Sequence, residues 1–231
     1  KAGATVLITN EANELAIALV NTFSEQGFDA HKVGSLQDSL LDSASALIFT
    51  GGLQQSLTTE RALEVNKQAF QWARRVADRF SDIGGSFITL QDTGGQFLSK
   101  PDELKGSKTL KVNPYVGGLT GLCKTAALEW PSAYVKAIDI ESGERSAAEL
   151  SECLLAEIVQ GGFEKEVGLL KTSTRGTLIS TPTLVTEATQ QSLSEGAVIV
   201  ASGGARGVTA ACLIALAKKV KPKIALLGRT D

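Results

Sequence analysis

The stretch that decides the fold is VIVASGGARGVTAACLIALAKK, which runs from Val198 to Lys219. A short apolar run leads into a loop rich in glycine, and a run with helical periodicity follows it. A buried strand that passes through a glycine turn into a helix is how a βαβ unit begins, because glycine permits the tight turn. The sequence therefore predicts the start of a nucleotide-binding α/β unit near residue 198.

Strands and helices also alternate through the chain before this stretch. Apolar runs and helical periodicity predict strands over residues 5–9, 28–33, 44–52, 85–92 and 134–142, and helices over residues 14–27, 58–80, 117–131 and 146–161. Residues 164–186 alternate in polarity and favour paired edge strands, while residues 186–196 resemble a linker. This order predicts an α/β fold with a Rossmann-like, doubly wound parallel sheet up to about residue 160, followed by the first βαβ of a second unit.

Composition excludes several classes of partner. The chain has 231 residues, of which 43% are hydrophobic and 21% charged, as in soluble globular proteins. A formal net charge of -2 gives no reason to expect nucleic acid or an anionic membrane. No apolar run approaches the roughly 20 residues of a spanning helix, and the first residues lack the features of a secretory signal. We expect a cytoplasmic protein and, because the sequence starts at Lys1 without any Met, a segment of a longer one.

The cysteines and the single histidine point to no metal site. Cys123, Cys153 and Cys212 lack CxxC spacing, and their odd number argues against a disulfide framework. His31 has no second histidine with which to share a metal. We expect buried free thiols in a reducing cytosol and a surface or edge histidine.

The glycine loop has the composition of a phosphate site. Glycines allow the backbone to approach a pyrophosphate, and the N–H groups at the start of the following helix point toward it. The next strand ends at an arginine, which favours the 2′-phosphate of NADPH over NADH. The alternative is that Arg229 is only a solvated strand end. The predicted cofactor-binding residues are Ser202, Gly203, Gly204, Ala205, Arg206, Gly207, Val208, Gly228, Arg229 and Thr230.

The stretch SGGARGVT resembles the T-G-x-x-x-G-x-G fingerprint of the short-chain dehydrogenase/reductase superfamily, with Ser202 for the threonine and Thr209 for the third glycine. Together with ALLGRTD it resembles the start of the catalytic half of a ketoreductase domain from polyketide synthases, in the variant found in bacterial polyunsaturated fatty acid synthases. The resemblance implies NADPH as cofactor and a β-ketoacyl group on an acyl carrier protein as substrate. It also implies neighbouring synthase domains as partners.

An earlier stretch, TNEANELA from Thr9 to Ala16, has the same position between a strand and a helix. In this alignment Asn10 replaces Gly203 and Glu14 replaces Gly207. Both glycines are lost, and carboxylates at a helix N-terminus repel a phosphate that the helix dipole would attract. We predict that this first site does not bind a dinucleotide.

The resemblance extends to three further positions. It places Asn66 at a functional asparagine, Lys124 at the catalytic lysine, and Thr120 where the catalytic tyrosine should be. Without that phenol the chain lacks a general acid for carbonyl reduction. Neither Tyr115 nor Tyr134 has a lysine four residues on. We predict no catalytic residue in this chain, and structural roles for Asn66 and Lys124.

The resulting hypothesis assigns residues 1–190 to a structural subdomain, closed by the β-rich stretch around residues 167–185. Residues 191–231 would begin a catalytic, NADPH-binding subdomain whose tyrosine and lysine lie beyond Asp231. A non-catalytic scaffold or docking domain with a reductase-like fold is the alternative. An independent reductase made of residues 1–160 is disfavoured by the degraded TNEANELA loop.

Overall fold

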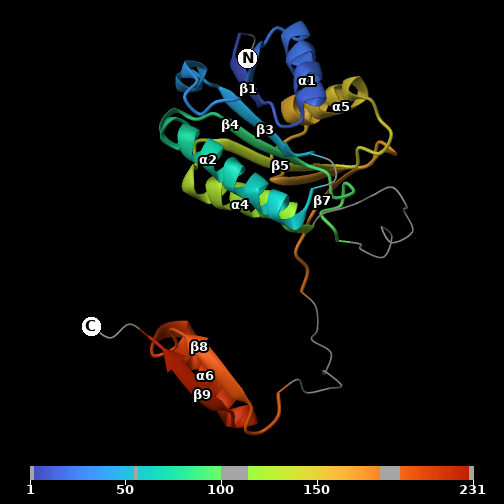
Figure 1. Cartoon of the computed structure of the whole chain (residues 1–231). Coiled ribbons are helices and arrows are strands. Elements are labelled where there is room, and N and C mark those ends of the chain that lie inside the picture. The colour runs from blue at the N-terminus through green and yellow to red at the C-terminus, as the bar shows by residue number, and fades with distance from the viewer. Residues whose placement is uncertain (1–2, 55–56, 100–113, 183–192, 229–231) are drawn as a thin grey trace. The chain divides into compact units, whose positions relative to one another are not determined.

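The computed structural model describes residues 3–54, 57–99, 114–182 and 193–228. The chain divides into two compact units, Lys1–Ile179 and Ser180–Asp231, shown in Figure 1. Each unit has its own sheet.

The first unit is built on a seven-stranded sheet in the order β2-β1-β3-β4-β5-β6-β7. Its strands are β1 (Thr5–Thr9), β2 (Asp29–Val33), β3 (Ala46–Gly52), β4 (Ser86–Gln91), β5 (Tyr134–Ile140), β6 (Glu166–Leu169) and β7 (Arg175–Thr177). All neighbouring pairs are parallel except β6 and β7. The predicted α/β fold with a mostly parallel sheet is confirmed. Of the predicted paired edge strands only β7 is at an edge, because β6 also pairs with β5.

Helices cover both faces of this sheet (Figure 1). One face carries α1 (Asn13–Glu25) and α5 (Ala147–Gln160), and the other carries α2 (Thr59–Ile83) and α4 (Gly118–Glu129). The short 3-10 turns η1 (Ser39–Asp42) and η2 (Pro114–Gly117) complete the unit. This arrangement follows from the βαβ connections, which return the chain across the sheet after each strand.

The helix ends follow local chemistry. Ser146 caps α5 in a reciprocal capping box with Glu149, as expected from a serine three residues before a glutamate. Helix α2 continues past the predicted end at Phe80 and stops at Gly84, whose φ of +80° suits glycine. The apolar stripe ends at Phe80, but the polar residues after it still form helix.

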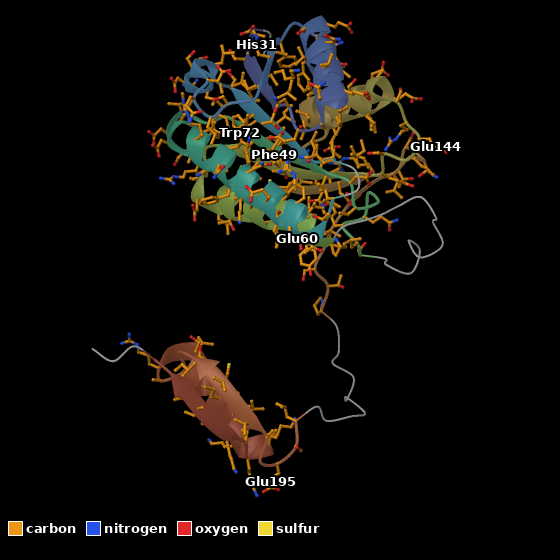
Figure 2. All side chains as sticks on the ribbon, in the orientation of Figure 1. His31, Phe49, Glu60, Trp72, Glu144 and Glu195 are labelled. Atoms are coloured by element: carbon orange, nitrogen blue, oxygen red, sulfur yellow. The ribbon has the colours of Figure 1, made fainter. Side chains whose placement is uncertain are left out.

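The core of the first unit has two parts, one on each face of the sheet. Phe49, Trp72 and Phe87 belong to the part beneath α2 and α4, and Figure 2 shows Phe49 and Trp72 there. Leu19 and Ile138 belong to the part beneath α1 and α5. Because both faces are covered, every residue of β3 is buried, as is usual for parallel strands.

The second unit contains β8 (Val198–Ser202), α6 (Gly207–Val220) and β9 (Lys223–Leu227). The two strands pair in parallel, as a βαβ unit requires. Val198 and Val200 remain 69% and 63% exposed, whereas the alternate residues Ile199 and Ala201 are partly buried. In the part of the chain that the structure describes, this two-stranded sheet is therefore covered on only one face.

Candidate nucleotide site and its upstream counterpart

The glycine loop joins β8 to α6 through four residues, Gly203–Arg206. Gly203, Gly204 and Gly207 have φ values of +79°, +88° and +67°. These lie in the left-handed region, which residues with a Cβ seldom occupy. The turn between strand and helix therefore depends on the three glycines.

The glycines differ in what surrounds them. A Cβ on Gly203 or Gly207 would meet no atom within 4 Å, whereas one on Gly204 would lie 2.9 Å from the Leu213 side chain. Gly204 thus allows α6 to pack close to the loop. Gly203 and Gly207 leave open space in which a ligand can approach the backbone.

The N-terminus of α6 is electrostatically suited to an anion. Its N-cap residue Arg206 makes no side-chain capping hydrogen bond, and the first turn contains no acidic residue. The first N–H groups of a helix lack partners within the helix, and the helix dipole places partial positive charge there. Lys218 and Lys219 lie in the last turn, where cations stabilise the opposite end of the dipole.

The structure brings most of the predicted cofactor residues to one edge of the sheet. Ser202 pairs with Leu227, and the N–H of Gly203 donates a hydrogen bond of 2.7 Å to the carbonyl of Leu227. Gly228 follows directly, so it lies beside the loop. Ala205, Arg206 and Val208 are exposed in the same turn. The remaining predicted residues, Arg229 and Thr230, lie outside the described residues.

The corresponding loop of the first unit is different. Only three residues, Asn10–Ala12, separate β1 from α1, and none of them has a positive φ. The hydroxyl of Thr50 lies within 3.2 Å of the Glu11 carboxylate and accepts a hydrogen bond from the N–H of Ala12. With Glu14 in the first turn of α1, two carboxylates lie where a phosphate would otherwise bind.

Thr120, at the position that the resemblance compares with the catalytic tyrosine, belongs to a buried hydrogen-bonded chain. Thr120 on α4 donates to Gln91 at the end of β4, with an O···O distance of 3.1 Å. Gln91 donates to Thr93 at 3.2 Å, and Thr93 donates to Asp139 on β5 at 2.8 Å. All four side chains are buried. Their polar groups are therefore used within the fold.

Asp139 is the centre of this chain. Besides the hydroxyl of Thr93, its carboxylate accepts hydrogen bonds of 2.6 Å from the backbone N–H groups of Thr93 and Phe97. Burial raises the pKa of Asp139 above its usual range, and these hydrogen bonds oppose that shift. Asp139 thus ties the segment after β4 to the neighbouring strand.

Lys124 and Asn66 also make contacts within the fold. The Lys124 ammonium lies 3.2 Å from the Glu166 carboxylate and is 56% exposed. The Asn66 amide donates to the carbonyl oxygens of Ala62 at 3.1 Å and Tyr115 at 2.6 Å, which links α2 to η2. These contacts are compatible with the predicted structural roles, which stay a prediction.

Sequence reasoning missed the chain of Gln91, Thr93, Thr120 and Asp139. A signal was present, since Gln91 ends β4 and Asp139 lies within β5, and both strands are mainly apolar and buried. Polar residues in strands that are buried on both faces need hydrogen-bond partners inside the protein.

The cysteines only partly match the expectation of buried thiols, because Cys153 is partly buried and Cys212 is exposed on the second unit's helix. All three cysteines are free, and Cys123 is buried. Burial raises the pKa of Cys123 to about 12, so its reactive thiolate is suppressed. His31 lies on the edge strand β2, 2.8 Å from the carboxylate of Asp29. Within the described ranges, no group of three His, Cys, Asp or Glu residues could hold a metal ion.

The longest helix that the structure describes, α2, has 25 residues, many of them charged. Neither α2 nor any other helix among the described residues is both long enough and apolar enough to cross a membrane.

Comparison with known sequences identifies one informative relative. The chain is 33% identical over 121 residues to a subunit of the polyunsaturated fatty acid synthase from Thraustochytrium sp. (strain ATCC 26185 / S-3). The match covers 49% of this chain and 4% of that protein, so the chain spans only a small part of its relative. No protein-family profile matches the chain.

Solved structures show the same fold. A short-chain dehydrogenase from Burkholderia cenocepacia J2315 in complex with NADP is 13% identical with a TM-score of 0.55, over 72% of this chain and 89% of that one. A ketoreductase domain from the bacillaene assembly line is 12% identical with a TM-score of 0.51, over 99% of this chain and 45% of that one. The predicted resemblance is confirmed: the chain has the fold of the short-chain dehydrogenase/reductases and is, over about half its length, a homologue of part of a polyunsaturated fatty acid synthase subunit.

Proposed function

We propose that the chain is part of the ketoreductase region of a multidomain fatty acid or polyketide synthase. The larger protein would reduce a 3-oxoacyl thioester on an acyl carrier protein to the 3-hydroxyacyl form, with NADPH as cofactor. The observation that carries this proposal is the contrast between the two strand–loop–helix turns. One turn has three glycines and an uncapped helix N-terminus, and the other has carboxylates. The homology to a synthase subunit and the fold shared with a ketoreductase domain support it.

The second unit fits a nicotinamide dinucleotide. Residues 202–208 would surround the pyrophosphate, because their glycines leave room at the backbone and α6 supplies free N–H groups. Gly228, Arg229 and Thr230 would contact the adenosine ribose, and a positive charge at Arg229 favours the 2′-phosphate of NADPH. When bound, the cofactor supplies the hydride.

The first unit would act as the structural subdomain. The position compared with the catalytic tyrosine is occupied by Thr120, whose hydroxyl is a poor acid near neutral pH and donates to Gln91. The Asp139 carboxylate at the other end of the buried chain accepts hydrogen bonds from Thr93 and Phe97 within the fold. We place the catalytic tyrosine and lysine in the part of the synthase beyond residue 231. The chain divides between Ile179 and Ser180. We propose the subdomain boundary near residue 190, which lies outside the described residues. The free thiols suit a reducing compartment such as the cytoplasm.

The test is nucleotide binding by the parent protein, meaning the larger synthase of which this chain would be a part, measured by fluorescence titration. Arg229→Ala should weaken NADPH binding about tenfold or more, because a charged contact with the 2′-phosphate is lost. NADH lacks that phosphate and should bind the variant and the parent equally. Equal NADPH affinity in both proteins would contradict the assignment of Arg229.

A non-catalytic scaffold remains the second candidate. The buried hydrogen-bonded chain that engages Thr120, at the position compared with the catalytic tyrosine, favours it. It requires that the parent protein bind no NADPH and reduce no 3-oxoacyl thioester, while removal of the first unit disrupts assembly. Measurable NADPH oxidation that depends on a 3-oxoacyl thioester would exclude this candidate.

A further inference from the structure

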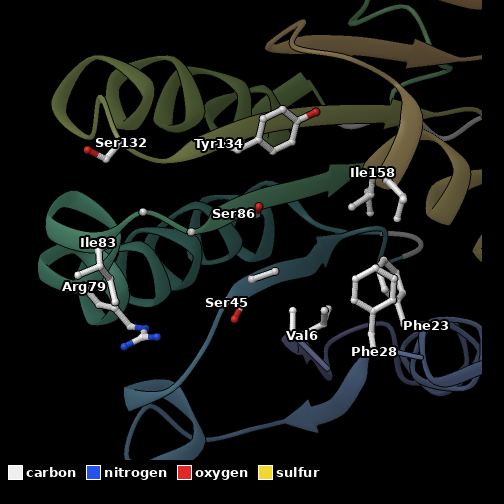
Figure 3. Close-up of a pocket in the computed structure, with 15 residues that line it drawn as sticks. Val6, Phe23, Phe28, Ser45, Arg79, Ile83, Ser86, Ser132, Tyr134 and Ile158 are labelled. Atoms are coloured by element: carbon white, nitrogen blue, oxygen red, sulfur yellow. The ribbon is translucent and has the colours of Figure 1, made fainter. Parts of the chain in front are cut away.

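A hollow of about 620 Å³ lies at the amino-terminal ends of β1, β3, β4 and β5. Its floor is formed by residues at or just before the strand starts, including Val6, Ser45, Ala46 and Ser86 (Figure 3). The loop Asn10–Ala12 follows the opposite, carboxyl end of β1. The hollow is therefore separate from the edge at which this fold is compared with nucleotide-binding proteins.

The two ends of the hollow differ in chemistry. Figure 3 shows the apolar side chains of Phe23, Phe28 and Ile158 at one end. The other end is formed by Arg79 and Ile83 from α2. A cavity of this volume with apolar walls at one end and a charged group at the other is suited to a small molecule. The apolar walls would bind the apolar part of the ligand, and the charged group would orient its polar part.

Arg79 differs from its neighbour Arg75 one turn earlier in α2. The Arg75 guanidinium donates to the carbonyl of Leu36 and forms an ion pair of 2.5 Å with Asp42. The Arg79 guanidinium instead donates to two carbonyl oxygens, those of Ala44 at 2.7 Å and Ser43 at 3.3 Å. Among the described residues no carboxylate lies within ion-pair distance of Arg79. Within the described residues the Arg79 guanidinium at the margin of the hollow is therefore held by carbonyl oxygens and not by a carboxylate.

We propose that this hollow binds a single-chain amphiphile with a carboxylate head, such as a medium-chain fatty carboxylate. The head group would pair with the Arg79 guanidinium, which still has unused N–H donors. The hydrocarbon chain would lie across Ala46 and reach Phe23 and Phe28, where its burial is favourable. The exposed Ile83, with 67% of its surface accessible, would be covered by the ligand near the head group.

This site does not depend on the proposed ketoreductase function. It lies on the first unit, whereas the predicted NADPH residues lie on the second. Failure of one proposal would leave the other unaffected.

Isothermal titration calorimetry of the 231-residue chain with decanoate tests the proposal. Saturable binding is expected, and Arg79→Gln should weaken it about tenfold to a hundredfold, as for loss of a hydrogen bond to a charged group. Arg75→Gln is the matched control and should leave the affinity unchanged. Decanol, which has no charge, should bind equally to the unsubstituted 231-residue chain and to its Arg79→Gln variant.

A second variant covers the case in which Arg79→Gln fails to fold. Ile83 is exposed, so Ile83→Glu should leave the fold intact. The new carboxylate beside the head group should weaken decanoate binding. Backbone amide shifts in NMR spectra should change at Gly84, Gly85 and Ser86 on titration. Absence of saturable binding, equal decanoate affinity in the variants and the parent, or amide shifts confined to other parts of the chain would each overturn the proposal.

Discussion

The loops Asn10–Ala12 and Gly203–Arg206 occupy the same place in two copies of one structural pattern. Each follows a five-residue parallel strand and leads into a helix of similar length. One loop has no positive φ and places Glu11 beside Thr50, whereas the other is bounded by glycines with positive φ. The strand–helix pattern is therefore separable from the phosphate chemistry, which depends on very few residues.

The two units also differ in how fully they bury their polar side chains and the faces of their sheets. The first unit buries polar residues such as Gln91 and Asp139 in hydrogen-bonded chains, and both faces of its sheet are covered. The second leaves Val198, Val200 and Val208 largely exposed in the described part of the chain. A sheet of two parallel strands gains little stability alone. The comparison shows that the first unit has a core on both sheet faces, whereas the described part of the second unit leaves one face of its sheet uncovered.

The largest expected effect tests the internal stability of the first unit. The ammonium of Lys136 is fully buried and lies 2.5 Å from Glu157, which also pairs with Arg175 at 2.7 Å. Glu157→Gln should lower the free energy of unfolding by about 3–5 kcal/mol, because it leaves a buried cation unpaired. Chemical denaturation measures this loss. Glu152→Gln, on the exposed side of the same helix, is the control and should change little.

The next largest effect is expected from a substitution that gives the second loop the charge of the first. In the first unit Glu14 occupies the position that aligns with Gly207. The substitution Gly207→Glu therefore gives the second loop the carboxylate of the first. NADPH binding by the parent protein should fall at least about a hundredfold, because a carboxylate opposes the phosphate and a side chain is strained at a φ of +67°. Gly207→Ala separates strain from charge and should have a smaller effect. Undiminished binding by Gly207→Glu would refute the phosphate role of this loop.

The smallest effect concerns backbone strain in the first unit. Ser173 is exposed and has a φ of +60°, a conformation that glycine adopts without strain. Ser173→Gly should raise the free energy of unfolding by about 0.5–1 kcal/mol, because relief of strain exceeds the added freedom of the unfolded chain and little burial is lost. Thermal unfolding measures the gain. Phe97→Gly is the comparison: Phe97 packs against the core, so its replacement should destabilise the protein.

Much of the fold could be predicted because its signals are local. The strand–helix alternation, the cap at Ser146 and the glycine loop each depend on residues a few positions apart. The end of α2 was less predictable, since the apolar stripe stops before the helix does. The parallel position of β6 was also missed, because pairing with β5 depends on where the chain returns after α5.

The sequence by itself determined the α/β pattern, the contrast between the two loops and the absence of a tyrosine at the position of Thr120. These properties depend on residue identity and on local spacing, which can be read directly from the chain. Only the tertiary structure decided that Thr93 meets Asp139, 46 residues away, and that Arg79 borders a hollow at the other end of the sheet. Such contacts arise from the packing of parallel strands and their covering helices, which brings together side chains whose distance along the chain gives no indication of their proximity.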